Sequence, residues 1–225
     1  MKKIKLYLYI ILAFLIVSCS ESDGPVEMGI EGDASYTVTF TMHWNSTDFP
    51  TDYPSGAHFS PLIGWSHPST NNFFNVGATA TEGIKVMAET GGTGTLKTEL
   101  EARIVAGEGF DFVLGSGLSS GTGEISVDVE VNADNPSVTL VSMVAPSPDW
   151  YVAALNVNLY DGTHFLDSKT IIAAVYDAGT DNGLSFASAN SITDPQVPIS
   201  LFVDAPLGDG TELPTAFATV IFVKK

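Results

Sequence analysis

The stretch TVTFTMHW, residues 37–44, alternates apolar and polar side chains at every position. In an extended chain its Val, Phe, Met and Trp side chains fall on one face, and its threonines and histidine on the other. Residues 124–131 (EISVDVEV) alternate in the same way, and so do residues 155–160 (LNVNLY). These patterns predict half-buried antiparallel strands. In the last of them we expect Leu155, Val157 and Leu159 to face inward.

Three further apolar runs, residues 137–144, 170–176 and 217–223, predict strands that are buried more deeply. Only residues 80–90 show helical spacing, and the Gly-Gly pair that follows predicts where this helix ends. Glu99, Glu101 and Glu124 are expected on strand surfaces. Turns rich in Gly, Pro and Asn separate the runs at spacings typical of a sandwich. The sequence therefore predicts an all-β protein, an antiparallel β-sandwich with one short peripheral helix, in a single domain over residues 35–225.

The first 18 residues have the pattern of a lipoprotein signal peptide. Three lysines precede an apolar run that is shorter than the ~20 residues needed to span a membrane. The run ends in LIVSC, which resembles the lipobox in which a cysteine, here Cys19, is lipidated and becomes the mature N-terminus. The alternative is an ordinary secretory signal followed by a chance cysteine. Because Cys19 is the only cysteine, an intramolecular disulfide is excluded.

Residues 19–34 are predicted to be a flexible tether between the lipid and the domain. Their early acidic residues resemble the surface-export signal of Bacteroidetes lipoproteins, but they also suit a merely solvated linker. The expected location is thus the outer membrane, facing the cell surface, with the periplasmic side left open. Removing residues 1–18 leaves six basic against 26 acidic residues, a net charge of −20. Such a charge argues against nucleic acid or anionic lipid as a direct partner.

Two acidic segments follow apolar runs and lie about thirty residues apart: PSPDW at 146–150 and DAGTDNG at 177–183. Carboxylates on loops at strand ends are suited to calcium, which takes six to eight oxygen ligands at about 2.3–2.6 Å. Gly179 and Gly183 allow the second loop to fold tightly. Asp, Gly, Thr and Asn are also ordinary turn residues, so this pattern alone leaves a pair of simple turns as the alternative.

Taken together, five segments resemble the spondin domain, a module of extracellular matrix proteins. They occur in the family's order, at similar separations, and cover about residues 35–223. The segments are YTVTF with Trp44, DYP with HFSPLIG and SH at 52–67, residues 83–91, MVAPSPDW at 143–150, and DAGTDNG at 177–183.

The resemblance implies a sandwich similar to calcium-dependent membrane-targeting domains, and a calcium site at Asp149, Asp177 and Asp181. Backbone carbonyls and water would complete the shell, because three carboxylates do not fill it. The chain lacks the cysteines and the additional repeats of the animal proteins. For this reason the fold is expected to transfer, but not the partners of those proteins.

Other functional patterns carry less weight. GLSSG at 117–121 fits a hydrolase nucleophile elbow, but it lies in a Gly/Ser loop and not between a strand and a helix. No two histidines have zinc-protease spacing, and structural hydrogen bonds are the expected role of His58 and His67. Trp65, with Phe73 and Phe74 in a polar loop, is a candidate aromatic platform for a sugar ligand.

The sequence thus predicts a non-enzymatic, calcium-binding adhesion or interaction module, anchored to the bacterial outer membrane by lipid. Its expected partners are the membrane, through the anchor, and an extracellular protein or glycan. The alternative is a carbohydrate-binding surface lipoprotein of a glycan-uptake system, with the Trp65 region as its platform.

Overall fold

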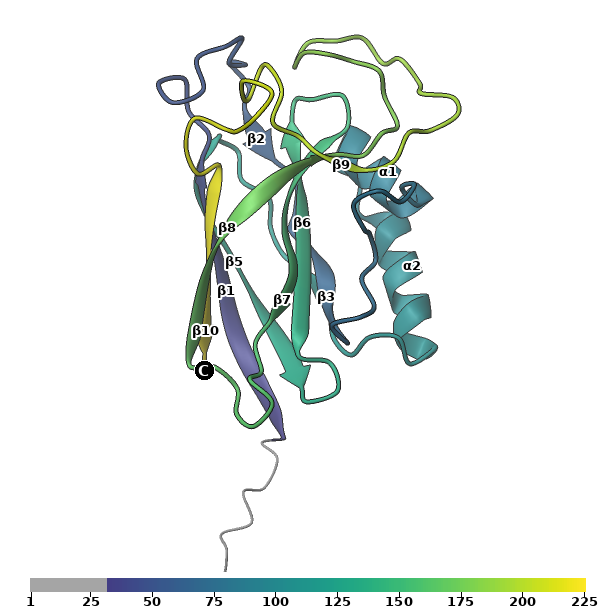
Figure 1. Cartoon of the computed structure of the whole chain (residues 1–225), viewed down its shortest axis with the longest axis vertical. Coiled ribbons are helices and arrows are strands. Elements are labelled where there is room, and N and C mark those ends of the chain that lie inside the picture. The colour runs from purple at the N-terminus through teal and green to yellow at the C-terminus, as the bar shows by residue number, and fades with distance from the viewer. Residues whose placement is uncertain (1–31) are drawn as a thin grey trace, which may run out of the picture.

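The structure, a computed structural model, describes residues 32–225. The predicted signal peptide, the predicted lipidation site Cys19 and nearly all of the predicted tether lie outside these residues. Within them, no helix is long and apolar enough to cross a membrane. Figure 1 shows the strands packed against one another, with the two helices on one side.

Ten strands and two helices form within residues 32–225. The strands are β1 (Asp33–His43), β2 (His58–Phe59), β3 (Ile63–His67), β4 (Phe112–Leu114), β5 (Thr122–Asn132), β6 (Ser137–Ala145), β7 (Trp150–Asn158), β8 (Ser168–Asp177), β9 (Ser200–Leu201) and β10 (Ala218–Lys224). The helices are α1 (Glu82–Thr90) and α2 (Gly94–Val105). All strand pairs are antiparallel, which confirms the predicted fold class.

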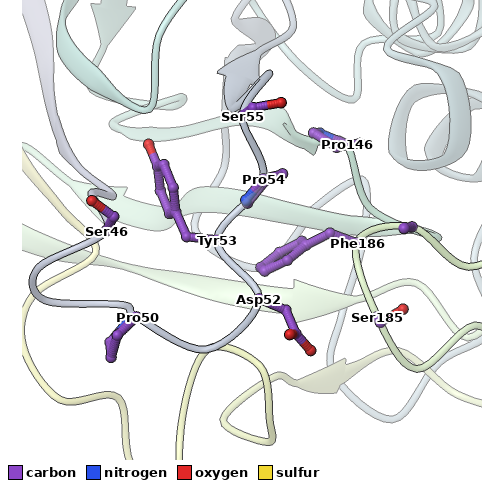
Figure 2. Close-up of a pocket in the computed structure, with 10 residues that line it drawn as sticks. Ser46, Pro50, Asp52, Tyr53, Pro54, Ser55, Pro146, Ser185 and Phe186 are labelled. Carbon is purple, nitrogen blue, oxygen red and sulfur yellow. The ribbon is translucent and has the colours of Figure 1, made fainter.

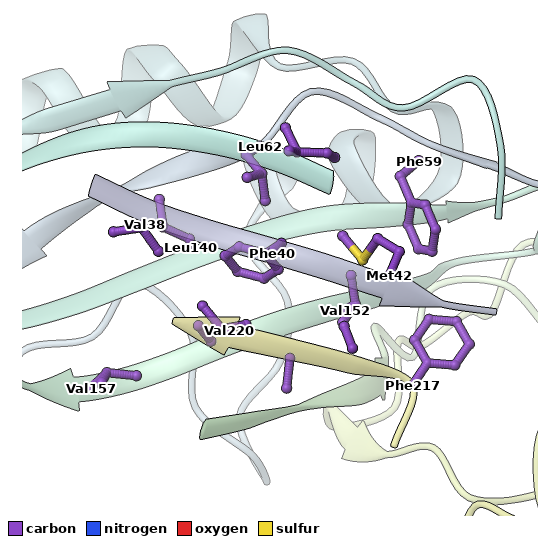
Figure 3. Close-up of a cluster of buried hydrophobic side chains, with 14 of the residues drawn as sticks. Val38, Phe40, Met42, Phe59, Leu62, Leu140, Val152, Val157, Phe217 and Val220 are labelled. Carbon is purple, nitrogen blue, oxygen red and sulfur yellow. The ribbon is translucent and has the colours of Figure 1, made fainter. Parts of the chain in front are cut away.

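The strands follow the order β4-β3-β6-β7-β8-β10-β1-β5, with β2 on β6 and β9 on β8. This sheet curls so that side chains from β1, β5 and β10 pack against side chains from β6 and β7 in one core. Figure 3 shows Val38, Phe40 and Met42 of β1 inside this core together with Leu140, Val152 and Val220. The alternation at residues 37–44 and 124–131 therefore buries the faces that the sequence predicts.

A second, smaller core lies between the other face of β3, β6 and β7 and the two helices. Thr81 caps the start of α1, where its hydroxyl accepts the Ile84 N–H, and Gly91 caps the end of the helix, where the sequence predicts that it stops. α2 was not expected from the sequence, and it places Glu99 and Glu101 on a helix and not on strands. Leu96 and Leu100 are its buried residues, one helical turn apart.

Three details of the strand predictions are wrong. The first concerns Leu155, which was expected to face the same way as Val157. The pairing of β6 with β7 shifts at a bulge, where Asn156 has a φ of 51°. Leu155 therefore packs against the second core, while Val157 lies in the first. β8 and β10 are also less buried than predicted. Ile172 is 68% exposed, because one face of β8 and β10 forms the outer surface of the sandwich.

Candidate functional site

The two acidic segments meet because β7 and β8 are neighbours in the sheet. Trp150, the first residue of β7, pairs directly with Asp177, the last residue of β8. Asp149 precedes that pair, and Asp181 follows it on the loop that leaves β8. The register of one strand pair therefore brings together carboxylates that are about thirty residues apart in the chain.

Asp149 holds the two segments together. Its Oδ2 atom accepts the backbone N–H groups of Thr180 at 2.7 Å and Asp181 at 3.0 Å, and the Thr180 hydroxyl at 3.2 Å. Its Oδ1 atom is buried and has no hydrogen-bond partner among the described residues. The whole residue is 0% exposed. A buried polar atom with no partner is uncommon in folded proteins and calls for a physical reason.

The other two carboxylates organise the loop after β8. Asp177 accepts the Gly179 N–H at 2.7 Å on Oδ1 and the Trp150 indole N–H at 3.2 Å on Oδ2. Asp181 accepts the Gly183 N–H at 2.7 Å and the Ser191 N–H at 2.8 Å, one from each arm of the loop. Each carboxylate therefore fixes backbone as well as contributing negative charge.

Gly179 and Gly183 fold this loop tightly, as predicted. Gly179 has a φ of 73°, and a Cβ there would lie 2.1 Å from the Val197 carbonyl oxygen. A Cβ on Gly183 would lie 2.6 Å from the Pro148 ring. Because Gly183 has no Cβ, the loop after β8 can pack closely against the Pro146–Asp149 segment, and the two acidic segments form one packed unit.

Burial and mutual repulsion make these charges costly in the absence of a counter-ion. Burial, together with the Asp177 charge, raises the pKa of Asp149 from 3.8 to about 6. Burial also raises the pKa of Asp177, and the charges of Asp181 and Asp204 raise it further. Asp204, on the segment after β9, is a carboxylate near the site that the sequence analysis missed. Its only sequence signal was its charge, because no motif surrounds it.

Within residues 32–225, no three Asp, Glu, His or Cys side chains form a group placed to hold a metal ion. The fit of a cation therefore depends on Asp149. Its partnerless Oδ1 supplies an oxygen of the kind that calcium prefers, in a place where a positive charge would relieve the repulsion from Asp177. This atom is the only observation at the cluster, within residues 32–225, that favours a hard cation, and the assignment of calcium and of all three carboxylates as its ligands stays a prediction.

The predicted sugar platform is wrong. Trp65, Phe73 and Phe74 are only 0%, 5% and 4% exposed. Trp65 lies on β3 beneath the helices, with the Arg103 guanidinium 4.6 Å from its ring and His67 stacked at 5.6 Å. The missed helix α2 is the physical reason for the error, because it supplies the Arg103 cover. These rings therefore belong to the second core.

The remaining patterns have structural roles. His67 is buried, and its ring nitrogens lie 2.8 Å from the Pro68 carbonyl and the Thr139 hydroxyl. His58 lies 2.7 Å from the Gly56 carbonyl. Residues 117–121 lie on the connection between β4 and β5, so the strand-to-helix turn of a nucleophile elbow does not occur there.

Comparison with known proteins identifies the family to which most of the described domain belongs. The Spondin_N family model matches residues 34–205, which include Asp149, Asp177 and Asp181. The chain is a member of the Spondin_N family. It is 35% identical to human Spondin-2 over 170 residues, which cover 72% of this chain and 50% of that protein. It is 30% identical to rat Spondin-1 over 176 residues, which cover 75% of this chain and 22% of that protein.

This spondin domain therefore spans about half the length of Spondin-2 and about a fifth of Spondin-1. The resemblance that the sequence motifs indicated is confirmed at the level of family and fold. Functions of the other parts of Spondin-2 and Spondin-1 cannot be inferred for this chain from the shared segment.

Proposed function

We propose that this spondin domain is a non-enzymatic extracellular interaction module whose loops are stiffened by calcium at Asp149, Asp177 and Asp181. The observation that carries the proposal is the buried Asp149 Oδ1 atom without a partner, beside a second carboxylate that repels it. Membership of the spondin family supports the interaction role.

The bound ion would supply positive charge among these carboxylates. Asp149 already links the two segments through the N–H groups of Thr180 and Asp181. Asp177 and Asp181 fix the loop after β8, and Trp150 anchors Asp177 to the core of the sandwich. Neutralising the repulsion between Asp149 and Asp177 would remove a force that pushes these two segments apart, so calcium would make the loops more rigid.

A thermal melt of the purified protein, with excess calcium and then with chelator, tests the site. An ion that binds only the folded state stabilises it by about 2.7 kcal/mol at a concentration 100 times its Kd. We expect a rise of the midpoint with calcium, which Asp177→Asn abolishes. Asp134→Asn, an equal charge change at an exposed turn residue, is the matched control and should keep the rise. Identical melts of the unaltered protein with and without calcium would overturn the calcium assignment.

We further propose that lipid at Cys19 anchors the domain to the bacterial outer membrane, facing the cell surface. The support is the lipobox-like sequence LIVSC at 15–19 and the acidic stretch after it. Mass spectrometry of the protein from its native membrane tests this directly. A mature N-terminus at Cys19 with a diacylglyceryl mass is the expected result, and an unmodified cysteine would contradict it.

A further inference from the structure

Two hollows lie next to each other at the end of the sandwich where β1 leads into its following loop. The first has a volume of about 810 Å³, and Asp52, Tyr53, Pro54, Ser185 and Phe186 are among the residues that line it (Figure 2). The second, of about 250 Å³, lies against Asp48, Asp209 and Glu212. Pro50 lines both, so we treat them as one paired hollow.

The charge of the paired hollow has one sign. Four carboxylates line it, those of Asp48, Asp52, Asp209 and Glu212, and no Lys, Arg or His is among its lining residues. The Thr211 hydroxyl and the N–H groups of Glu212 and Thr211 lower the pKa of Asp209 to about 2, so this group stays ionised. The whole chain has a net charge of −17. Anionic ligands are therefore repelled, and a cationic group is attracted.

The apolar walls of the first hollow are fixed in place. The Tyr53 hydroxyl donates to the Trp44 carbonyl at 3.1 Å, and its ring packs edge-on against Trp44 at 5.4 Å. Phe186 packs on Trp44 at 5.2 Å and on Trp150 at 5.5 Å. Rigid rings beside a carboxylate suit a Lys or Arg side chain, whose aliphatic stem contacts the apolar wall while its charged end meets the carboxylate.

We propose that the paired hollow binds an extended segment of a protein partner that carries two basic side chains, one for each hollow. This inference rests on the proposed interaction function and names the chemistry of its partner. The single sign of charge over both hollows is the argument for a basic occupant. The shared Pro50 wall is the argument for one segment that spans both. A neutral sugar would leave the four carboxylates without a counter-charge.

The hollow is connected to the acidic cluster through one loop. Ser185 and Phe186 lie on the 182–191 loop, whose two arms are held by the Asp181 carboxylate. Trp150 links the two sites as well, because its indole N–H donates to Asp177 while its ring contacts Phe186. Calcium at the cluster should therefore order one wall of the hollow, and the basic segment should bind more tightly with calcium than with chelator.

The test is fluorescence anisotropy with the purified protein at physiological ionic strength. The probe is an end-blocked, labelled Gly/Pro peptide that carries two arginines, and the same peptide with two glutamates is its negative counterpart. Asp52→Asn should weaken binding of the arginine peptide about twofold to fivefold, the range of one exposed charge contact. Asp134→Asn, at the far end of β5, removes the same charge from outside the hollow and should leave the affinity unchanged.

The outcomes separate this inference from the calcium assignment. Equal losses in Asp52→Asn and Asp134→Asn would show that the peptide senses only net charge, and would overturn the paired hollow as its site. Binding of maltohexaose without binding of the arginine peptide would also overturn it. A calcium-dependent melt with no peptide binding would remove the inference and leave the calcium site standing. Peptide binding without any calcium effect on the melt would overturn the calcium site and leave the paired hollow as the peptide site.

Discussion

Replacing Asp149 by asparagine should stabilise the metal-free protein and at the same time remove its response to calcium. The amide oxygen of asparagine can still accept the N–H groups of Thr180 and Asp181, which Asp149 Oδ2 accepts in the structure. The substitution removes the negative charge of a fully buried residue beside Asp177. It also puts an amide NH2 where the partnerless Oδ1 atom lies, a cost that does not change with pH. Asp149→Asn therefore separates the structural role of this side chain from its proposed role in binding an ion.

The magnitude follows from the pKa of Asp149. Burial and the Asp177 charge raise that pKa from 3.8 to about 6. At about 1.4 kcal/mol per pH unit, the ionised side chain lowers the free energy of unfolding by about 3 kcal/mol at neutral pH. For a domain of this size, at about 2–4 °C per kcal/mol, removal of the charge alone corresponds to a gain of roughly 6–12 °C in Tm, and the unpaired amide NH2 offsets part of that gain.

The pH dependence has a definite sign. A carboxyl whose folded pKa is raised contributes full stability below its unfolded pKa, and that stability is lost as pH rises through the folded value. The metal-free wild-type protein should therefore lose stability, relative to Asp149→Asn, between about pH 4 and pH 6. The pH-dependent part of the gap between the two proteins should be about 3 kcal/mol at pH 7.5, roughly half of that at pH 5, and about 0.5 kcal/mol at pH 4.

Chemical denaturation in chelator across this pH range measures the gap, and melts with calcium measure the ion's effect on each protein. A gap that does not grow between pH 4 and pH 7.5 in chelator would refute the reasoning, since it would show that ionisation of Asp149 does not destabilise the metal-free fold. An equal calcium response in both proteins would refute the role of Asp149 in binding.

Other substitutions test the packing around the site. Trp65→Ala should cost about 3–5 kcal/mol in chemical denaturation, because Trp65 is a core residue, whereas Leu184→Ala, at an 84% exposed position, should change stability by less than about 0.5 kcal/mol. Gly179→Ala forces a Cβ to within 2.1 Å of the Val197 carbonyl at a φ of 73° and should cost about 1–3 kcal/mol, along with weaker calcium binding by calorimetry. Lys225→Ala removes a 2.8 Å surface ion pair to Asp128, and we expect a loss of less than about 1 kcal/mol in the same denaturation assay.

The parts of the fold that were predictable are those where one face is buried and the other is solvated. β1 and β5 alternate without interruption, so period and burial agree residue by residue. α2 escaped prediction because its buried stripe is narrow: Leu96 and Leu100 are buried, and most of its other residues are exposed or half-buried. The bulge at Asn156 also has no local signal in the sequence, because the slip is defined by how β7 pairs with β6.

In the candidate site, too, local features could be predicted, whereas features that depend on strand pairing could not. The register of β7 and β8, which pairs Trp150 with Asp177, is what makes the two acidic segments neighbours, and the sequence supplied this only through the family resemblance. The prediction of an exposed aromatic platform was wrong because local composition misled it. A polar loop around Phe73 and Phe74 suggested exposure, but Arg103 covers the Trp65 ring, and both phenylalanines pack in the second core with residues of the helices. Exposure depends on elements distant in the chain, which local composition does not show.

Asp149 explains why an ion would matter to a domain that already has two packed cores. The same carboxylate that satisfies the N–H groups of Thr180 and Asp181 brings a buried charge next to Asp177. An apolar residue there would leave those two N–H groups without an acceptor, and asparagine would satisfy them without the charge. Asparagine would also put an NH2 group where the partnerless Oδ1 atom lies, but it would still accept both N–H groups, so those hydrogen bonds are not by themselves a reason for the charge. A cation that rigidifies the wall of the neighbouring hollow supplies one, since it would make partner binding depend on extracellular calcium.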